Sequence, residues 1–123
     1  MRPQPLIAVT DVEASSRWYQ RLLDCRSDHG GSEYERLVSN GQLVLQLHSF
    51  EVEHHHVPIG DRYDKPYGNG VLLWFEVEDF DAVIQRSTEM GVRWSCTGIE
   101  TLPMVTAVRI TGSAGYGTRM ATS

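Results

Sequence analysis

The chain has 123 residues, of which 41% are hydrophobic and 22% are charged, so its composition suits one globular domain and argues against disorder. Its net charge of −5 and pI of about 5.4 argue against a nucleic-acid partner or an anionic membrane surface, and favour a neutral or cationic ligand. No apolar run is long enough to span a membrane, and the first residues lack the apolar stretch of a signal peptide, so we expect a cytoplasmic protein.

The first elements expected are a strand that leads to Asp11 and a helix over about residues 12–23. Asp11 is placed to cap this helix, because its carboxylate can accept hydrogen bonds from amide groups of the first turn. The apolar spacing predicts one buried side of the helix, formed by Val12, Tyr19, Leu22 and Leu23.

Three strand segments follow the helix, near residues 25–29, 34–39 and 42–50. Asn40-Gly41, between the last two, predicts a tight hairpin turn. These elements form a first β-α-β-β-β module at about residues 1–50. Residues 51–70 carry Pro, Gly and Asp without hydrophobic periodicity, which predicts a linker.

A second module is expected at about residues 71–123, because the opening pattern of the first returns there. Residues 7–14 and 75–82 both read apolar-x-Val-x-Asp-apolar-acid-Ala. Asp79 is again placed to cap a helix, over about residues 80–90, and Gly91 suits its C-terminal end. The apolar side of this helix is formed by Phe80, Val83, Ile84 and Met90. Three strands are expected after it, near residues 92–96, 106–110 and 116–121, with a turn over residues 112–115 between the last two.

The sequence resembles the vicinal-oxygen-chelate superfamily, which includes glyoxalases, bleomycin resistance proteins and extradiol dioxygenases. The resemblance is carried by PLIAVTDVEASSRWYQRLLD at residues 5–24 and NGVLLWFEVEDFDAVIQRSTEMGV at residues 69–92. It is weaker from Thr97 onward, where only Gly115-Tyr116 matches the closing turn of the family. The resemblance implies a single α+β domain, in which two tandem β-α-β-β-β modules form curved half-barrels around a cleft.

In the enzymes of this superfamily, a divalent metal is held by His, Gln or Glu side chains from the first and last strand of each module. Counting from the matched motifs places these positions at Gln4, Gln46, Leu72 and Arg119. Leu72 has no donor atom and Arg119 is a permanent cation, so the set does not suit a catalytic metal. The three consecutive histidines at 54–56 would point in different directions in an extended segment, so we expect them not to bind a metal together. The sequence has no Walker loop or dinucleotide-binding motif, and we expect no other cofactor.

Alternation along the strands predicts which side chains face the cleft, because residues of one parity share a face. On this basis Trp74 can stack on a flat ring, and Glu76 can accept hydrogen bonds from a cationic or hydroxylated ligand. The alternatives are a core-filling role for Trp74 and a structural role for His48. The ligand-binding residues expected are Gln4, Leu6, Gln46, His48, Leu72, Trp74, Glu76 and Arg119.

Two functions are consistent with such a cleft. The first, favoured by the unsuitable metal positions, is a metal-free protein that sequesters an antibiotic or related natural product, as bleomycin resistance proteins do. The second is an enzyme of the superfamily, namely a lyase, isomerase or dioxygenase acting on a small oxygenated substrate, with His48 or Glu76 as candidate catalytic base. In either case we expect a homodimer, because two half-barrels leave sheet edges that a second copy would cover.

Overall fold

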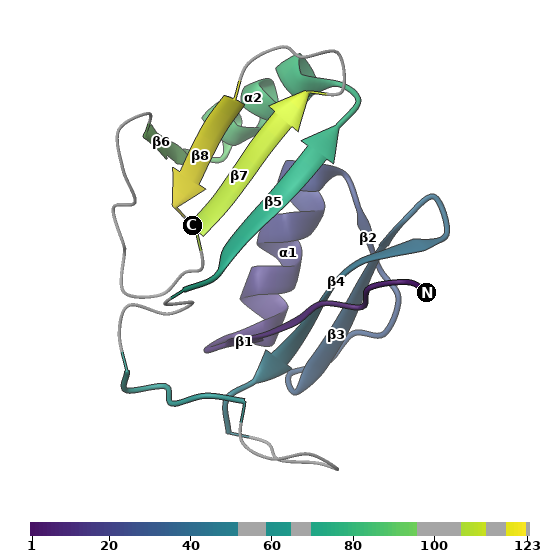
Figure 1. Ribbon diagram of the computed structural model, residues 1–123, viewed down its shortest axis with the longest axis vertical. Helices are drawn as coiled ribbons and strands as arrows, with labels where there is room; N and C mark the ends of the chain where they lie inside the picture. Colours follow the sequence, from purple (N-terminus) through teal and green to yellow (C-terminus); the bar gives the residue numbers. More distant parts are fainter. Residues whose placement is uncertain (52–58, 65–69, 96–106, 113–117, 123) are drawn as a thin grey trace. The chain divides into compact units, whose positions relative to one another are not determined.

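The computed structural model describes residues 1–51, 59–64, 70–95, 107–112 and 118–122. The chain divides into two compact units, residues 1–64 and 65–123, and the boundary lies within the predicted linker. Among the described residues, each unit contains a strand, a helix and three further strands in chain order (Figure 1). The expected α+β composition and the β-α-β-β-β order are therefore confirmed for these residues.

The first unit contains β1 (Leu6–Val9), α1 (Val12–Leu23), β2 (Arg26–Ser27), β3 (Tyr34–Ser39) and β4 (Gln42–Ser49). Its sheet has the order β1-β4-β3-β2. β1 is parallel to β4, whereas the other two pairs are antiparallel. The first and last strands of this unit are therefore neighbours.

The N-terminal cap of α1 is confirmed, because Asp11 Oδ1 accepts a hydrogen bond from the backbone N of Ala14 at 3.0 Å. Asp24 ends the helix in the left-handed conformation, with φ of 54°. The buried side of α1 consists of Val12, Ser16, Tyr19 and Leu22, whereas Leu23 is only half-buried. The sheet contributes Leu37, Leu45 and Leu47 to the core.

The predicted hairpin turn between β3 and β4 is also confirmed. Asn40 and Gly41 have φ values of 51° and 76°. Two consecutive left-handed residues match the right-handed twist of the flanking strands, and Asn-Gly is the pair that adopts this conformation most readily. The turn fixes where the two strands begin to pair.

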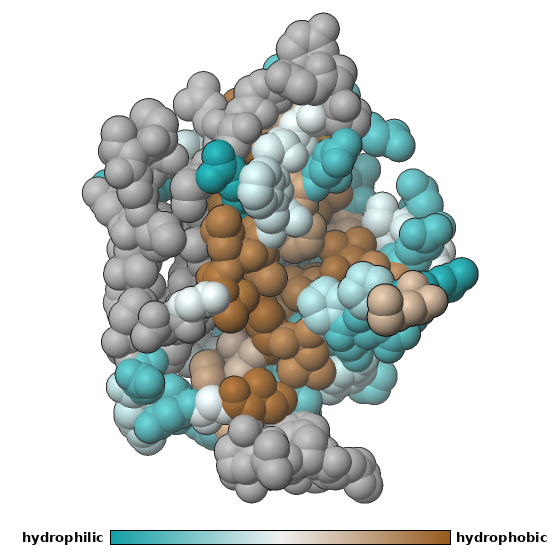
Figure 2. All heavy atoms as spheres, in the orientation of Figure 1, coloured by the Kyte–Doolittle hydropathy of each residue, from teal (hydrophilic) through white to brown (hydrophobic). Residues whose placement is uncertain are grey.

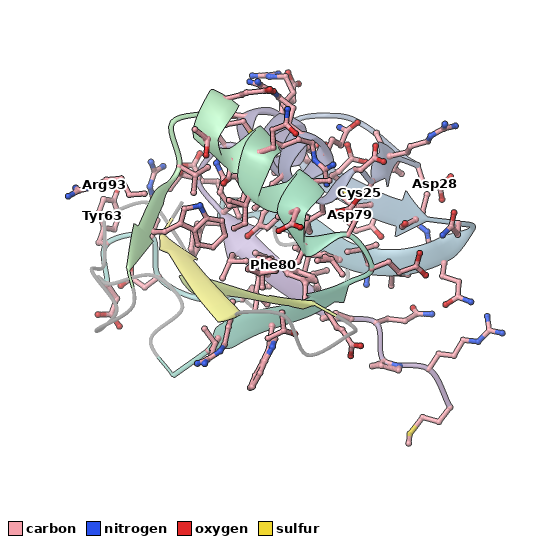
Figure 3. All side chains as sticks on the ribbon, turned by 90° about the horizontal axis from the view of Figure 1, so that it is seen from above. Cys25, Asp28, Tyr63, Asp79, Phe80 and Arg93 are labelled. Carbon is pink, nitrogen blue, oxygen red and sulfur yellow. The ribbon has the colours of Figure 1, made fainter. Side chains whose placement is uncertain are left out.

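Cys25, directly after α1, is a buried free thiol (Figure 3). Its Sγ donates a hydrogen bond to the carbonyl oxygen of Tyr19 at 3.5 Å. Burial raises the pKa of this thiol to about 11, so it is protonated at neutral pH and is a poor nucleophile. Cys96 lies outside the described residues.

The second unit contains β5 (Leu72–Val77), α2 (Phe80–Glu89), β6 (Arg93–Ser95), β7 (Ala107–Gly112) and β8 (Thr118–Thr122). None of the described helices is long and apolar enough to cross a membrane.

The ends of α2 also follow the prediction. Asp79 Oδ1 caps the helix by accepting from the backbone N of Ala82 at 3.0 Å, and Figure 3 labels Asp79 and Phe80 at the start of the helix. Gly91 follows its C-terminal end in the left-handed conformation, with φ of 70°. Of the predicted turn at 112–115, residues 113–115 lie outside the described part of the chain.

The two sheets differ in strand order. In the second, the order is β5-β7-β8-β6, so the first strand is parallel to the third strand of its unit and not to the last (Figure 1). β8 pairs Arg119 with Ile110, and Ile110 lies opposite Phe75. Position 119 is therefore in register with Phe75 across the sheet. The sequence pattern had instead predicted that Arg119 lies on the same face of the sheet as Trp74. The difference arises because β7, not β8, is the neighbour of β5.

Candidate functional site

One face of the first sheet gathers several of the predicted ligand-binding residues. The register pairs Leu6 with Gln46, and it pairs His48 with both Ala8 and Tyr34. Paired residues project from the same side of a sheet. We call this set of Leu6, Tyr34, Gln46 and His48 the Gln46 face. The other side of the same strands carries Leu37, Leu45 and Leu47 of the core.

The Gln46 side chain is held on both of its amide atoms. Its Oε1 accepts a hydrogen bond from the hydroxyl of Tyr34. Its Nε2 donates to the backbone oxygen of Gln4 at 3.1 Å. Gln4 therefore lies beside Gln46, but the contact uses the main chain of Gln4 and not its amide side chain. The oxygen of Gln46 that would coordinate a metal is already engaged by Tyr34.

Tyr34 stands between two histidines, of which sequence reasoning identified only His48. The ring of His29 contacts Tyr34 edge-on, with ring centres 4.8 Å apart, and the corresponding distance to His48 is 6.5 Å. His48 is only 6% exposed, and its Nδ1 lies 2.7 Å from the carbonyl oxygen of Ser49. Since a carbonyl oxygen only accepts, Nδ1 carries the proton in this contact.

Glu35 is a buried carboxylate that sequence reasoning did not single out. It is 3% exposed and accepts hydrogen bonds from the hydroxyls of Ser16 and Ser27, both at 2.8 Å. The backbone N–H groups that donate to it belong to His29 at 3.3 Å, Gly30 at 2.9 Å and Arg36 at 2.8 Å. Glu35 therefore connects α1, β2 and the loop that carries His29. Glu35 is two residues from the core residue Leu37 on β3, so the two side chains project from the same face of the strand. This spacing could have indicated from the sequence that Glu35 is buried.

The ionisation of Glu35 follows from these contacts. Burial by itself raises the pKa of a carboxyl group, but the hydrogen bonds from Gly30, Ser27 and Ser16 outweigh burial and lower the pKa of Glu35. Glu35 is therefore a carboxylate at neutral pH, and its role in the unit is structural: it holds the loop of His29 beside Tyr34.

Trp74 stands on the exposed face of the second sheet, and this side chain is 60% exposed. Its Nε1 donates to the hydroxyl of Thr111 at 3.2 Å. The guanidinium carbon of Arg109 lies 4.8 Å from the centre of the Trp74 ring. The register pairs Trp74 with Arg109, and it pairs Glu76 with Thr111.

We call Leu72, Trp74, Glu76, Arg109 and Thr111 the Trp74 face. Leu72 and Glu76 are exposed like Trp74, and apolar surface gathers over the start of β5 (Figure 2). Leu73, Phe75 and Val77, on the opposite side of the strand, are half-buried. Arg109 and Thr111 were missed because they belong to the third strand of the unit, which was not expected beside β5.

The residues present do not fit the catalytic metal of the superfamily. The Gln46 oxygen accepts from Tyr34, and Leu72 has no donor atom. Among the described residues, no group of three or more His, Cys, Asp or Glu side chains could hold a metal ion. The His54–His56 triplet and the side chain of Arg119 lie outside the described part of the structure.

Several solved structures resemble this one in fold. The fosfomycin resistance protein FosX of Listeria monocytogenes, solved with manganese(II) and sulfate, is 10% identical, with a TM-score of 0.53 over 89% of this chain and 78% of its own. A possible glyoxalase from Bacillus cereus is 16% identical, with a TM-score of 0.56 over 88% and 95% of the two chains. An integron cassette protein of Vibrio cholerae is 17% identical, with a TM-score of 0.57 over 100% and 84%. At these identities the likeness concerns the fold.

No curated protein matches the sequence. Residues 3–119 match the Glyoxalase/Bleomycin resistance protein/Dioxygenase superfamily, and this match spans nearly the whole chain. The resemblance noted in the two opening segments is thereby extended through the C-terminal part of the sequence. The chain therefore belongs to the Glyoxalase/Bleomycin resistance protein/Dioxygenase superfamily.

Proposed function

We propose that this protein binds a small natural product, such as an antibiotic, and sequesters it without a metal ion. The observation that carries the proposal is the state of Gln46. At a position where the enzymes of the superfamily hold their metal, its amide is occupied by Tyr34 and by the backbone of Gln4. A side chain held in this way can shape a binding surface, and its carbonyl oxygen has one lone pair fewer to offer a cation.

The exposed Trp74 supports the same proposal. A large aromatic side chain on an exposed sheet face, fixed by a hydrogen bond to Thr111, offers a flat apolar surface for a ligand ring. Glu76 on the same strand adds a hydrogen-bond acceptor. We include Gln4, Leu6, Gln46, His48, Leu72, Trp74 and Glu76 in the proposed ligand-binding set, and leave out Arg119 because its position is in register with Phe75.

Calorimetric titration of the protein with a panel of antibiotics, before and after dialysis against a chelator, tests the proposal. We expect saturable binding with one ligand per chain, unchanged affinity after chelation, and recovery of the ligand in its original form. Elemental analysis of the purified protein should show far less than one zinc, iron, nickel or manganese ion per chain. A stoichiometric metal whose removal abolishes binding would contradict the proposal.

The experiment also decides between binding and catalysis. Ligand recovered in a chemically altered form would favour the enzymatic alternative, in which His48 or Glu76 acts as a base. Replacement of each residue by Gln would then identify the base, because loss of turnover with retained binding is the expected signature of a catalytic group.

A further inference from the structure

Trp74 is exposed, but its orientation is fixed. Its indole N–H donates to Thr111, and one side of its ring lies against the guanidinium of Arg109. An exposed side chain normally loses rotational freedom when a ligand binds, and this loss weakens the complex. Because Trp74 is already held at two points, a ligand ring that stacks on it incurs less of this cost.

Arg109 gives this face a permanent positive charge. A guanidinium remains protonated at every physiological pH, and its flat shape suits both stacking on an indole and paired hydrogen bonds to a carboxylate. Arg109 is placed here by the backbone, because the parallel register of β5 and β7 pairs it with Trp74. The charge is therefore a fixed property of the surface on which a ligand ring would lie.

Glu76 places a negative charge on the same face, one row further along. It pairs with Thr111, whereas Arg109 pairs with Trp74. A carboxylate on a bound ligand would be repelled from the Glu76 end and attracted by the guanidinium beside Trp74. An anionic group of a bound ligand is therefore expected to lie at the Arg109 end of the face and not at the Glu76 end.

We infer that the Trp74 face selects a planar aromatic ligand that carries an anionic group, such as a carboxylate, over neutral and cationic analogues. The inference rests on the proposed binding function and specifies its ligand class. It differs from the expectation drawn from the net charge of −5, which favoured a neutral or cationic ligand. The local charge beside the stacking surface decides the preference, because screening by salt weakens the effect of distant surface charges.

Three probes with one ring system and different charges test the inference. We would titrate the protein with 2-naphthoate, 2-naphthylmethanol and 2-naphthylmethylammonium, and follow the indole N–H signal of Trp74 by NMR, assigned with a Trp74→Phe variant. We expect 2-naphthoate to bind about five-fold or more tightly than the neutral probe, and the cationic probe to bind most weakly. The preference should shrink as salt concentration rises.

Arg109→Gln, with Arg93→Gln as a matched control, assigns the preference to one side chain. Both variants change the net charge equally, and Arg93 is an exposed residue of β6. We expect Arg109→Gln to bind the three probes within about two-fold of one another, with a weaker affinity for all three because one of the two contacts that hold Trp74 is lost. Arg93→Gln should keep both the parent affinity and the parent preference. The amide spectra of both variants should match the parent, which establishes that they fold.

The outcomes separate this inference from the function on which it rests. Equal affinity for all three probes, a preference for the cation, or an anion preference that survives Arg109→Gln would overturn the inference and leave aromatic binding at Trp74 intact. If no probe shifts the Trp74 signal at millimolar concentration, binding at this face fails, and the inference fails with it.

Discussion

Glu35 illustrates how a single carboxylate can organise one side of a sheet. It accepts hydrogen bonds from Ser16 of α1, Ser27 of β2 and three backbone amides, so its loss would leave the buried hydroxyl of Ser16 and four partly buried donors without this acceptor. A fully buried donor such as Ser16 costs about 1–3 kcal/mol if nothing replaces the acceptor, and water can reach the others. The loop at residues 28–31, and with it the position of His29 beside Tyr34, therefore depends on a residue on the opposite side of β3.

We expect Glu35→Gln to destabilise the protein at neutral pH and much less in acid. The pKa of Glu35 in the folded protein lies below the 4.5 of an ordinary glutamate. The charged group therefore stabilises the folded state above about pH 4.5, and this contribution is lost as the pH falls through the lowered value. Urea unfolding at several pH values between 7 and 3 measures the difference. A gap between parent and variant that is constant with pH would contradict the expected role of the carboxylate.

Trp74→Ala should weaken ligand binding at least several-fold, because stacking on an indole contributes on the order of 1 kcal/mol beyond buried area. Phe75→Leu is the matched control, since Phe75 is half-buried on the other side of the same strand. This control should lower the melting temperature more than it lowers affinity. Calorimetric titration together with thermal unfolding separates the two effects, and the opposite pattern would show that the binding face of β5 was assigned incorrectly.

At the scale of the elements, the two helix starts should behave as equivalent sites. Asp11 and Asp79 cap α1 and α2 through the same contact at the same distance. Replacement of either by Ala should lower the free energy of unfolding by about 1 kcal/mol, and Asn should restore most of the loss because its side chain also accepts from the first turn. Urea unfolding measures both. If only one of the two Ala variants lowered the free energy of unfolding, the two capping contacts would not be energetically equivalent, although the sequence pattern around them is repeated.

Local signals in the sequence predicted the elements well. Cap residues, the left-handed Gly91 and the Asn40-Gly41 turn lie within a few residues of the structure they determine, so the bounds of α1, α2, β3 and β4 followed from them. Pairing between strands depends on contacts between distant residues and was harder to predict. The register shifts between Leu37 and Val38, so simple counting from the turn fails beyond that point.

This shift explains why part of the candidate site was missed. Counting outward from Asn40-Gly41 without a bulge places Tyr34 opposite Leu47, whereas the structure pairs it with His48. A one-residue shift moves a side chain to the other face of a sheet. Similarly, Arg109 could not be assigned to the Trp74 face without the strand order of the second sheet.

At the scale of the whole molecule, we predict a homodimer. Among the described strands, the first sheet ends in β1 and β2, and the second ends in β5 and β6. Unpaired strand edges favour association with another chain, and two-fold pairing of identical copies is the commonest way to cover them. Light scattering at micromolar concentration should give twice the mass of 13.9 kDa. A monomer under these conditions would rule the prediction out.

The strand order of the second sheet also determines which end of the chain tolerates alteration. β8 lies between β7 and β6, so it is an inner strand although it is the last in the sequence. Deleting residues 118–122 would remove two ladders of hydrogen bonds and separate β6 from the rest of its sheet. The residues before β1 precede a strand whose one neighbour within the described part of the chain is β4. Affinity tags and fusion partners are therefore better attached to the N-terminus, with residues 4 and 5 left intact because they hydrogen-bond to Gln46. Shortened versions of the protein should retain β8 in full.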